Sequence, residues 1–229
     1  MAEEKLAYLY TTAELYEPGH TRAWPWLEKT LHPWEILPHI GEIILAVGAT
    51  LDLEDYDYVA DNVWIAKSAT IAPTATIHGP AIIGAGTEVR PGAFIRGNAL
   101  VGDGCVVGNS TELKNVILSD SVQVPHYNYV GDSVLGYKSH MGAGSITSNV
   151  KSDKTLVGIK AADTVLATER KKVGAMLGDF VEVGCNSVLN PGTVVGPHTS
   201  IYPLSSVRGV VPAHAIFKSG AGWEIVPKQ

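Results

Sequence analysis

Polar side chains gather between residues 96 and 149, in a sequence whose flanking stretches consist mainly of aliphatic and small residues. His126 lies in this segment, and an imidazole can take up a proton near neutral pH. Arg96 and Lys114 lie 18 residues apart in it, and two cations at a fixed spacing can bind one anionic group. Proton transfer beside a bound anion is therefore the chemistry that these residue types favour.

A six-residue repeat indicates the elements that position these side chains. From Ile65 to Leu113 an aliphatic residue returns at every sixth position, a period that belongs neither to a helix nor to an ordinary strand. The spacing shortens to five residues at Leu118 and at Leu135, and the regular spacing resumes at Leu177. Short strands joined by tight corners, three to a coil of about 18 residues, produce such a pattern. The sequence predicts an all-β solenoid with about seven or eight parallel coils.

Two regions depart from the repeat. Residues 1–60 are predicted to form a mainly helical N-terminal cap, and residues 61–229 the β-helix, with an irregular loop around 147–172. Apolar residues recur at helical spacing in the cap until Gly48. We expect this apolar stripe to pack on the first coil and protect its open strand edge. Alternatively, the tryptophan-rich face of the cap contacts a partner protein through Trp24, Trp26 and Trp34.

Composition and charge narrow the classes of function. The net charge is −6 and Lys and Arg form no long basic run, so nucleic-acid binding is not expected. No apolar stretch approaches the roughly 20 residues that a membrane span needs. The acidic and polar start, Met1–Lys5, does not resemble a cleavable signal, and we expect a cytoplasmic protein. Cys105 and Cys185 lack metal-ligand spacing and are expected to be reduced packing residues.

Three motifs in the polar segment carry a resemblance to a known family. They are Glu112-Leu113-Lys114, His126-Tyr127-Asn128-Tyr129-Val130-Gly131-Asp132 and Met141-Gly142-Ala143-Gly144-Ser145-Ile146-Thr147-Ser148-Asn149. In order and spacing they resemble the acetyltransferase domain of the bifunctional N-acetylglucosamine-1-phosphate uridyltransferase/glucosamine-1-phosphate acetyltransferase, one of the hexapeptide-repeat transferases. The resemblance implies a left-handed parallel β-helix, a homotrimer, and acetyl-CoA as a co-substrate bound between neighbouring prisms. The acyl transfer that follows from it needs no metal, because side-chain and backbone donors can hold both the oxyanion and the phosphate.

The resemblance also implies roles for individual residues. His126 would be the general base that takes the proton of an attacking sugar amine, and Glu112 would orient or polarise its imidazole. For the phosphate of the sugar, Arg90 stands in the family's Arg-Pro-Gly-Ala sequence, whereas Arg96 has the family's 18-residue spacing from Lys114. Residues one coil apart stack about 4.8 Å from each other, so we predict that Arg96 and Lys114 form the phosphate pair.

Four further positions follow from the same resemblance. Tyr129 would hydrogen-bond the sugar phosphate, and Asn149 a sugar hydroxyl or amine. His140 replaces a substrate-binding asparagine of the family, and the backbone N–H of Ala143 would stabilise the oxyanion of the tetrahedral intermediate. The family's substrate-binding lysine has no certain counterpart, and the candidates are Lys151 and Lys154.

These motifs favour an acyl-CoA-dependent N-acyltransferase that acts on an amino sugar, with a hexosamine 1-phosphate as the first choice of acceptor. The alternative is a non-catalytic, trimeric β-helix module that binds a sugar nucleotide or a partner nucleotidyltransferase. The sequence lacks the glycine-rich G-x-G-T-R-M stretch of nucleotidyltransferases, so nucleotidyl transfer by this chain is not expected.

Overall fold

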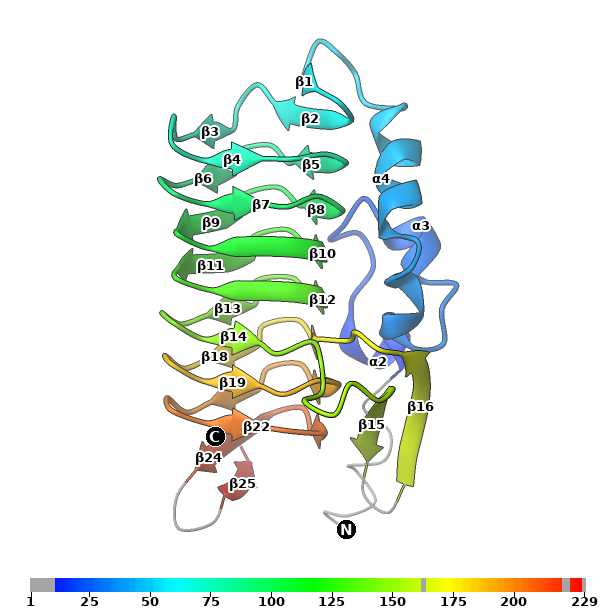
Figure 1. Ribbon diagram of the computed structural model, residues 1–229, viewed down its shortest axis with the longest axis vertical. Coiled ribbons are helices and arrows are strands. Elements are labelled where there is room, and N and C mark those ends of the chain that lie inside the picture. The colour runs from blue at the N-terminus through cyan, green and yellow to red at the C-terminus, as the bar shows by residue number, and fades with distance from the viewer. Residues whose placement is uncertain (1–10, 162–163, 220–222, 228–229) are drawn as a thin grey trace.

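The computed structural model describes residues 11–161, 164–219 and 223–227. It confirms a parallel β-helix, in which coil after coil stacks with a left-handed winding and a helical layer lies along one side (Figure 1). The expectation about the acidic start, Met1–Lys5, concerns residues outside the described ranges. Within those ranges, no helix is long and apolar enough to cross a membrane.

The coils form a three-sided prism with a covered face, a rear face and a front face. The covered face, next to the helices, contains β2 (Val63–Ala66), β5 (Ala81–Ile83), β8 (Ala99–Val101), β17 (Ala175–Leu177), β20 (Thr193–Val195) and β23 (Val210–Val211). The rear face contains β3 (Thr70–Ile71), β6 (Glu88–Val89), β9 (Val106–Asn109), β11 (Gln123–His126), β13 (His140–Met141), β18 (Glu182–Val183), β21 (Ser200–Ile201) and β24 (Ala215–Ser219). The front face contains β4 (Thr76–Ile77), β7 (Phe94–Ile95), β14 (Ile146–Thr147), β19 (Val188–Leu189) and β22 (Ser206–Val207).

Two longer strands, β10 (Glu112–Leu118) and β12 (Tyr129–Leu135), begin on the front face and continue onto the covered face. Leu118 pairs with Val101 above it and with Leu135 below it, so the shortened steps in the sequence are the places where a corner loses a residue. The backbone turns instead at Asn115 and Asp132, which have φ values of 55° and 49°. Asn and Asp tolerate this left-handed conformation better than most residues.

The repeating aliphatic residues fill the interior of the prism, as the six-residue period predicts. Leu113, Val130 and Leu189 are fully buried there, and Ile71 and Ile77 of the first coil are partly buried. Side chains of a strand alternate between its two sides, so the residues before and after each of these core positions point outward. The interior therefore holds the register that places outward side chains of successive coils above one another.

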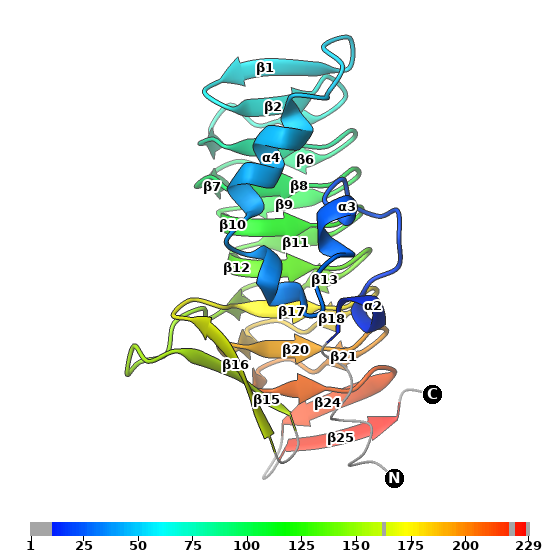
Figure 2. The ribbon, with the colours of Figure 1, turned by 90° about the vertical axis from the view of Figure 1, so that its right-hand side faces the viewer.

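The N-terminal helices lie along the covered face rather than over the first coil, which corrects the expected position of the cap (Figure 2). They are α2 (Thr12–Leu15), α3 (Trp24–Leu27), the 3-10 helix η1 (Pro33–Ile36) and α4 (Ile40–Gly48). The reason is that the covered face is apolar on its outer side too, and Ile82, Leu100, Ile117 and Val134 are buried in one cluster with the helices. At the first coil, β1 (Tyr56–Ala60) pairs antiparallel with β2.

The irregular segment around 147–172 contains a β-hairpin, which we call the arm. It consists of β15 (Val157–Ala161) and β16 (Thr164–Arg170), and it separates β14 from β17. Val157 and Ile159 are buried in the same cluster as Met176 and Val194 of the covered face. At the opposite end of the prism from β1, β25 (Trp223–Pro227) pairs antiparallel with β24.

Packing of the helical layer on the covered face should contribute to the free energy of unfolding. Leu100 is fully buried between β8 and the helices, so Leu100→Ala should lower the free energy of unfolding by about 2–5 kcal/mol. The matched control is Leu53→Ala, whose side chain is 64% exposed and whose effect should stay within about 0.5 kcal/mol. Urea unfolding followed by circular dichroism measures both. Equal effects of the two variants would show that the helices do not pack on this face.

The two cysteines differ in environment. Cys105 is buried, as expected, whereas Cys185 is exposed, so the packing role expected for Cys185 is wrong. Burial raises the pKa of the Cys105 thiol to about 12, and the thiolate is the reactive form. At pH 8 a maleimide should therefore modify one thiol of the folded protein quickly, and Cys185→Ser should abolish that fast reaction. Mass spectrometry reads the result, and fast labelling of Cys105 in the variant would contradict the structure.

Candidate active site

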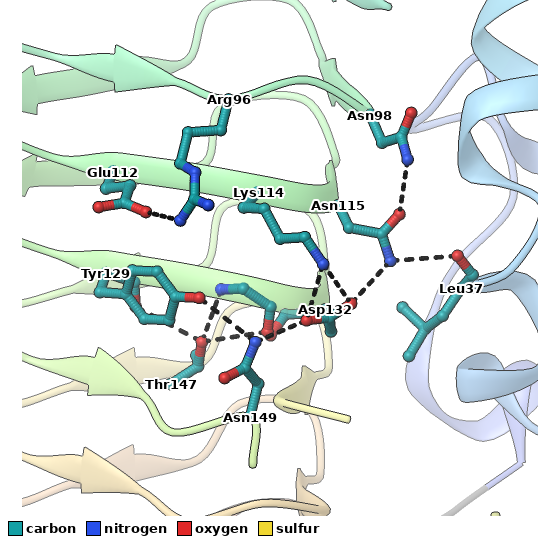
Figure 3. Close-up of polar contacts among 12 residues, drawn as sticks. Leu37, Arg96, Asn98, Glu112, Lys114, Asn115, Tyr129, Asp132, Thr147 and Asn149 are labelled. Carbon is teal, nitrogen blue, oxygen red and sulfur yellow. Dashed lines mark hydrogen bonds and ion pairs between the residues drawn. The ribbon is translucent and has the colours of Figure 1, made fainter. Parts of the chain in front are cut away.

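Outward side chains of three stacked strands form a polar cluster on the front face (Figure 3). Glu112 of β10 pairs in register with Phe94 of β7 above and with Tyr129 of β12 below. The same register pairs Leu113 with Ile95, so Arg96 and Lys114, the next residues of each strand, lie one coil apart in one column. This is the arrangement that their 18-residue spacing predicts.

Arg90 lies elsewhere. It directly follows β6 on the rear face, and its guanidinium donates to the Glu88 carboxylate at 3.0 Å. The motif around Arg90 therefore does not bring this residue into the column of Lys114. Of the two arginines considered for the phosphate, Arg96 is the one that the structure places in the front-face cluster.

Glu112 is engaged with Arg96 rather than with the catalytic histidine expected from the sequence. An Nη1 of Arg96 donates to Glu112 Oε1 at 2.6 Å, and this bond raises the pKa of Arg96 above its ordinary value. In the part of the chain that the structure describes, the ring of His126 has no hydrogen bond to Glu112 or to another side chain. The structure therefore does not contain the expected contact between Glu112 and His126. The reason is the register: the residue beside Glu112 in the coil below is Tyr129, which lies three residues beyond His126 along the chain.

His126 ends β11, at the corner between the rear and front faces, and is exposed. The buried Asn128 braces this corner: its Oδ1 accepts from the His126 N–H at 3.1 Å, and its Nδ2 donates to the Gly142 carbonyl at 2.9 Å. In the coil below, the Gly144 N–H donates to the His126 carbonyl at 3.0 Å. The turn at Ala143 therefore lies directly beneath His126.

The backbone N–H of Ala143 is available to a ligand. Its neighbours Gly142 and Gly144 donate to Val183 and His126, but among the described residues the Ala143 N–H makes no hydrogen bond. An imidazole that can accept a proton and an amide that can donate to an oxyanion thus lie one above the other, at the same corner of two successive coils. This is the pair of groups that acyl transfer needs.

Asp132 lies at the other corner of the front face and is the centre of its polar network (Figure 3). Its side chain is 5% exposed and forms an ion pair with Lys114, whose Nζ lies 3.2 Å from Oδ1. Asn115 donates to the same oxygen at 3.0 Å, and Asn149 donates to Oδ2 at 2.6 Å. Each hydrogen bond lowers the cost of burying this carboxylate.

Tyr129 and Asn149 meet below the two cations. Asn149 Nδ2 donates to the Tyr129 hydroxyl at 3.3 Å. Burial, followed by the carboxylates of Asp132 and Glu112, raises the pKa of Tyr129. The phenol therefore keeps its proton at neutral pH and can donate it to a ligand oxygen, such as that of a phosphate.

His140 is not part of this cluster. It begins β13 on the rear face, where its Nδ1 lies 2.8 Å from Oε2 of Glu182. In the coil above, its register partner is Gln123, three residues before His126. The structure thus separates His140 from the residues grouped with it by sequence.

A groove adjoins the cluster, between the arm and the lower coils of the front face. It has a volume of about 620 Å³, and Ser148 and Val150, on either side of Asn149, line it. Lys151 also lines the groove, but its Nζ is bonded to Thr155 at 2.6 Å and paired with Asp153 at 3.5 Å. Of the two lysines considered as substrate ligands, Lys151 is therefore already engaged within its own loop.

A known sequence family covers the residues of this cluster. The GMPPB C-terminal domain, as a sequence family, matches residues 77–203, which is more than half of the 229 residues. The chain belongs to the GMPPB C-terminal domain family. The matched residues include the front-face cluster, His126 and the arm, whereas the N-terminal helices, Thr12 to Gly48, lie outside the match.

The chain matches only part of the length of its curated relatives. Over 109 residues the chain is 32% identical to a bifunctional sugar-1-phosphate nucleotidylyltransferase/acetyltransferase from Sulfurisphaera tokodaii, a match that covers 48% of the chain and 27% of that relative. Over 93 residues it is 37% identical to a bifunctional protein GlmU from Methanococcus vannielii, covering 41% and 22%. The matches thus span about a quarter of these relatives. In the acetyltransferase domain of PglB from Neisseria gonorrhoeae, solved with acetyl coenzyme A, 16% of residues are identical, with a TM-score of 0.39 over 81% of this chain and 64% of that one.

Sequence reasoning missed three residues of the site in this family member. Asn115, Asn128 and Asp132 are polar and nearly fully buried, and each joins segments of different coils. The sequence does contain a pattern that marks two of them. Asn115 and Asp132 lie within the shortened five-residue steps, where the corner must turn in fewer residues. Their partners could not be read from the sequence.

Proposed function

We propose that the protein is an acyl-CoA-dependent N-acyltransferase whose acceptor is an amino sugar phosphate, with a hexosamine 1-phosphate as first choice. The observation that carries the proposal is the placement of His126 directly above Ala143, whose N–H makes no hydrogen bond among the described residues. Both lie at the corner where the rear face meets the front face, which bears the cations Arg96 and Lys114. The names of the bifunctional relatives, a sugar-1-phosphate nucleotidylyltransferase/acetyltransferase and a GlmU protein, support the same class of reaction.

The residues would divide the reaction between the two corners of the front face. Arg96, Lys114 and the Tyr129 hydroxyl would hold the phosphate at one corner. At the other, His126 would accept the proton of the amine as its nitrogen bonds to the thioester carbonyl carbon. The Ala143 N–H would stabilise the oxyanion, and His126 would return the proton to the thiolate when the carbon–sulfur bond breaks. The products are an amide and free coenzyme A.

Release of free thiol tests the proposal. Acetyl-CoA is mixed with the protein and glucosamine 1-phosphate, and the thiol is detected with a disulfide reagent, while glucose 1-phosphate serves as the acceptor without an amine. Thiol release that requires the amine supports N-acyl transfer. A panel of amino sugars and their phosphates that yields no thiol would overturn the enzyme and leave the non-catalytic module. The homotrimer expected from the family resemblance, and the cytoplasmic location expected from the polar N-terminal sequence, belong to the same proposal.

A further inference from the structure

We propose that Asp132 is a positioning residue that fixes the side chains of Asn149 and Lys114, so that the site prefers a sugar phosphate bearing a hydrogen-bond donor beside its phosphate. The inference rests on the proposed function. It adds the residue that would create this selectivity, although Asp132 itself is almost entirely covered and does not have to touch the ligand.

The first argument concerns the orientation of the Asn149 amide. A carboxylate can only accept hydrogen bonds, so the group that faces Asp132 Oδ2 at 2.6 Å must be the NH₂ of Asn149. The same nitrogen faces the Tyr129 hydroxyl at 3.3 Å. The carbonyl oxygen, Oδ1, is thereby turned away from both, and within the described residues it accepts no hydrogen bond. An amine or hydroxyl of a ligand is the partner that this oxygen can take.

The second argument concerns charge. The two cations of the front-face cluster are both paired, Arg96 with Glu112 and Lys114 with Asp132. An anion therefore meets a cluster in which positive and negative side chains balance, and its binding must rely on N–H groups that point the right way. The Lys114 ammonium has three N–H bonds, so it can remain tied to Asp132 and still donate to a phosphate.

The third argument concerns what holds Asp132 itself. Asn115 donates to Asp132 Oδ1 at 3.0 Å and to the carbonyl of Leu37, which follows η1, at 3.1 Å (Figure 3). Asn98, one coil above, donates to Asn115 Oδ1 at 3.4 Å. The carboxylate is thus anchored to the helical layer as well as to the coils. This chain of bonds gives the N-terminal helices a direct connection to the site.

Asp132→Asn separates positioning from simple charge balance, because the two make opposite predictions. If Asp132 only offset the cations, its neutralisation would strengthen binding of a phosphate. If it positions Asn149 and Lys114, the variant should bind glucosamine 1-phosphate about tenfold or more weakly, since the lost bonds are charge-assisted. The wild-type preference for glucosamine 1-phosphate over 2-deoxyglucose 1-phosphate, which lacks a donor at that carbon, should also fall toward unity.

Titration calorimetry with these two sugar phosphates measures both quantities without requiring turnover. The control, Glu88→Gln, removes the carboxylate partner of Arg90 on the rear face and should leave both affinities unchanged. In an Asn149→Ala background, Asp132→Asn should have a much smaller effect on the selectivity, because its route to the ligand is gone. A loss of fold alone would not produce this coupling.

Asn149→Asp provides a second variant at a partly exposed position, should Asp132→Asn fail to fold. It retains an acceptor oxygen but cannot donate to Asp132, so it too should weaken binding of glucosamine 1-phosphate. If either variant binds glucosamine 1-phosphate as tightly as the wild type or more tightly, and keeps its selectivity, the positioning role of Asp132 is overturned. The proposed function is not affected by that result. A wild-type protein that binds neither sugar phosphate would overturn the proposed acceptor and, with it, this inference.

Discussion

Replacement of His126 by alanine is expected to lower kcat for acetyl transfer by about 10²–10⁴-fold, the range typical of a lost general base. The reason is that the attacking amine must lose a proton as it bonds to the thioester, and His126 is the group beside the Ala143 amide that can take it. The Michaelis constant for the sugar phosphate should change little, because the phosphate is held at the opposite corner. Thiol release under saturating substrates measures the effect.

His39→Ala is the matched control for this prediction. His39 is an exposed histidine of the helical layer, paired with Glu42, and its loss should leave kcat unchanged. The variant His126→Gln keeps a polar side chain of similar reach but cannot take the proton, and it should be as inactive as His126→Ala. Turnover by either His126 variant within threefold of the wild type would remove His126 from the mechanism and would require another base.

The second large effect is expected at Arg96. Arg96→Ala should raise the Michaelis constant for the sugar phosphate by about 10–100-fold, the cost of losing a charge-assisted bond to phosphate, with a smaller change in kcat. Arg90→Ala should change the constant less than about twofold, because Arg90 is paired with Glu88 on the rear face. Both variants lose one positive charge, so a difference between them reflects position and not net charge.

Steady-state kinetics at fixed acetyl-CoA distinguish the two arginines directly. A larger effect from Arg90→Ala would mean that the Arg-Pro-Gly-Ala motif, and not the register of the coils, identifies the phosphate ligand. Equal, small effects would point to Lys114 and Tyr129 as the main phosphate contacts. Glucose 1-phosphate as a competitive inhibitor should lose affinity for Arg96→Ala in the same proportion as the substrate, because both carry the same phosphate.

The six-residue period predicted the fold well because it reports a repeated physical requirement. Each coil must place an aliphatic side chain in the interior on each of its three sides, so one residue type recurs at a fixed spacing. The same spacing predicted that Arg96 lies above Lys114, since residues a whole coil apart occupy one column. The two shortened steps also gave the correct alignment of the coils, because Leu118 pairs with Val101 and with Leu135.

Side-chain pairing was less predictable, because it depends on directions that spacing does not determine. Glu112 can reach Arg96 one coil above as readily as a corner residue one coil below, and the structure selects Arg96. Asp132 belongs to a motif quoted from the sequence, yet its contacts with Asn115 and Asn149 depend on how the backbone turns at the shortened corner. The register of the strands follows from the sequence pattern, whereas the hydrogen bonds between side chains follow from the three-dimensional structure.

The position of the helical layer was predicted wrongly for a different reason. Attention to core positions alone assigns every other residue of a strand to solvent. In the strands of the covered face, Ile82, Leu100 and Ile117 occupy these outward positions and are buried. An apolar residue on both sides of a strand is the mark of a sheet covered on both faces, and it would have placed the helices correctly.

The helical layer also has a consequence for symmetry. A prism with three long sides, one of which is covered by helices, has two sides by which copies of itself can approach. A ring closed by a threefold axis joins neighbours through two different surfaces of each copy, which is a heterologous contact. If the protein forms the expected homotrimer, the front and rear faces provide these surfaces and the helices face outward. Asn115 and Leu37 would then tie the rim of the ring to a site at its subunit boundary.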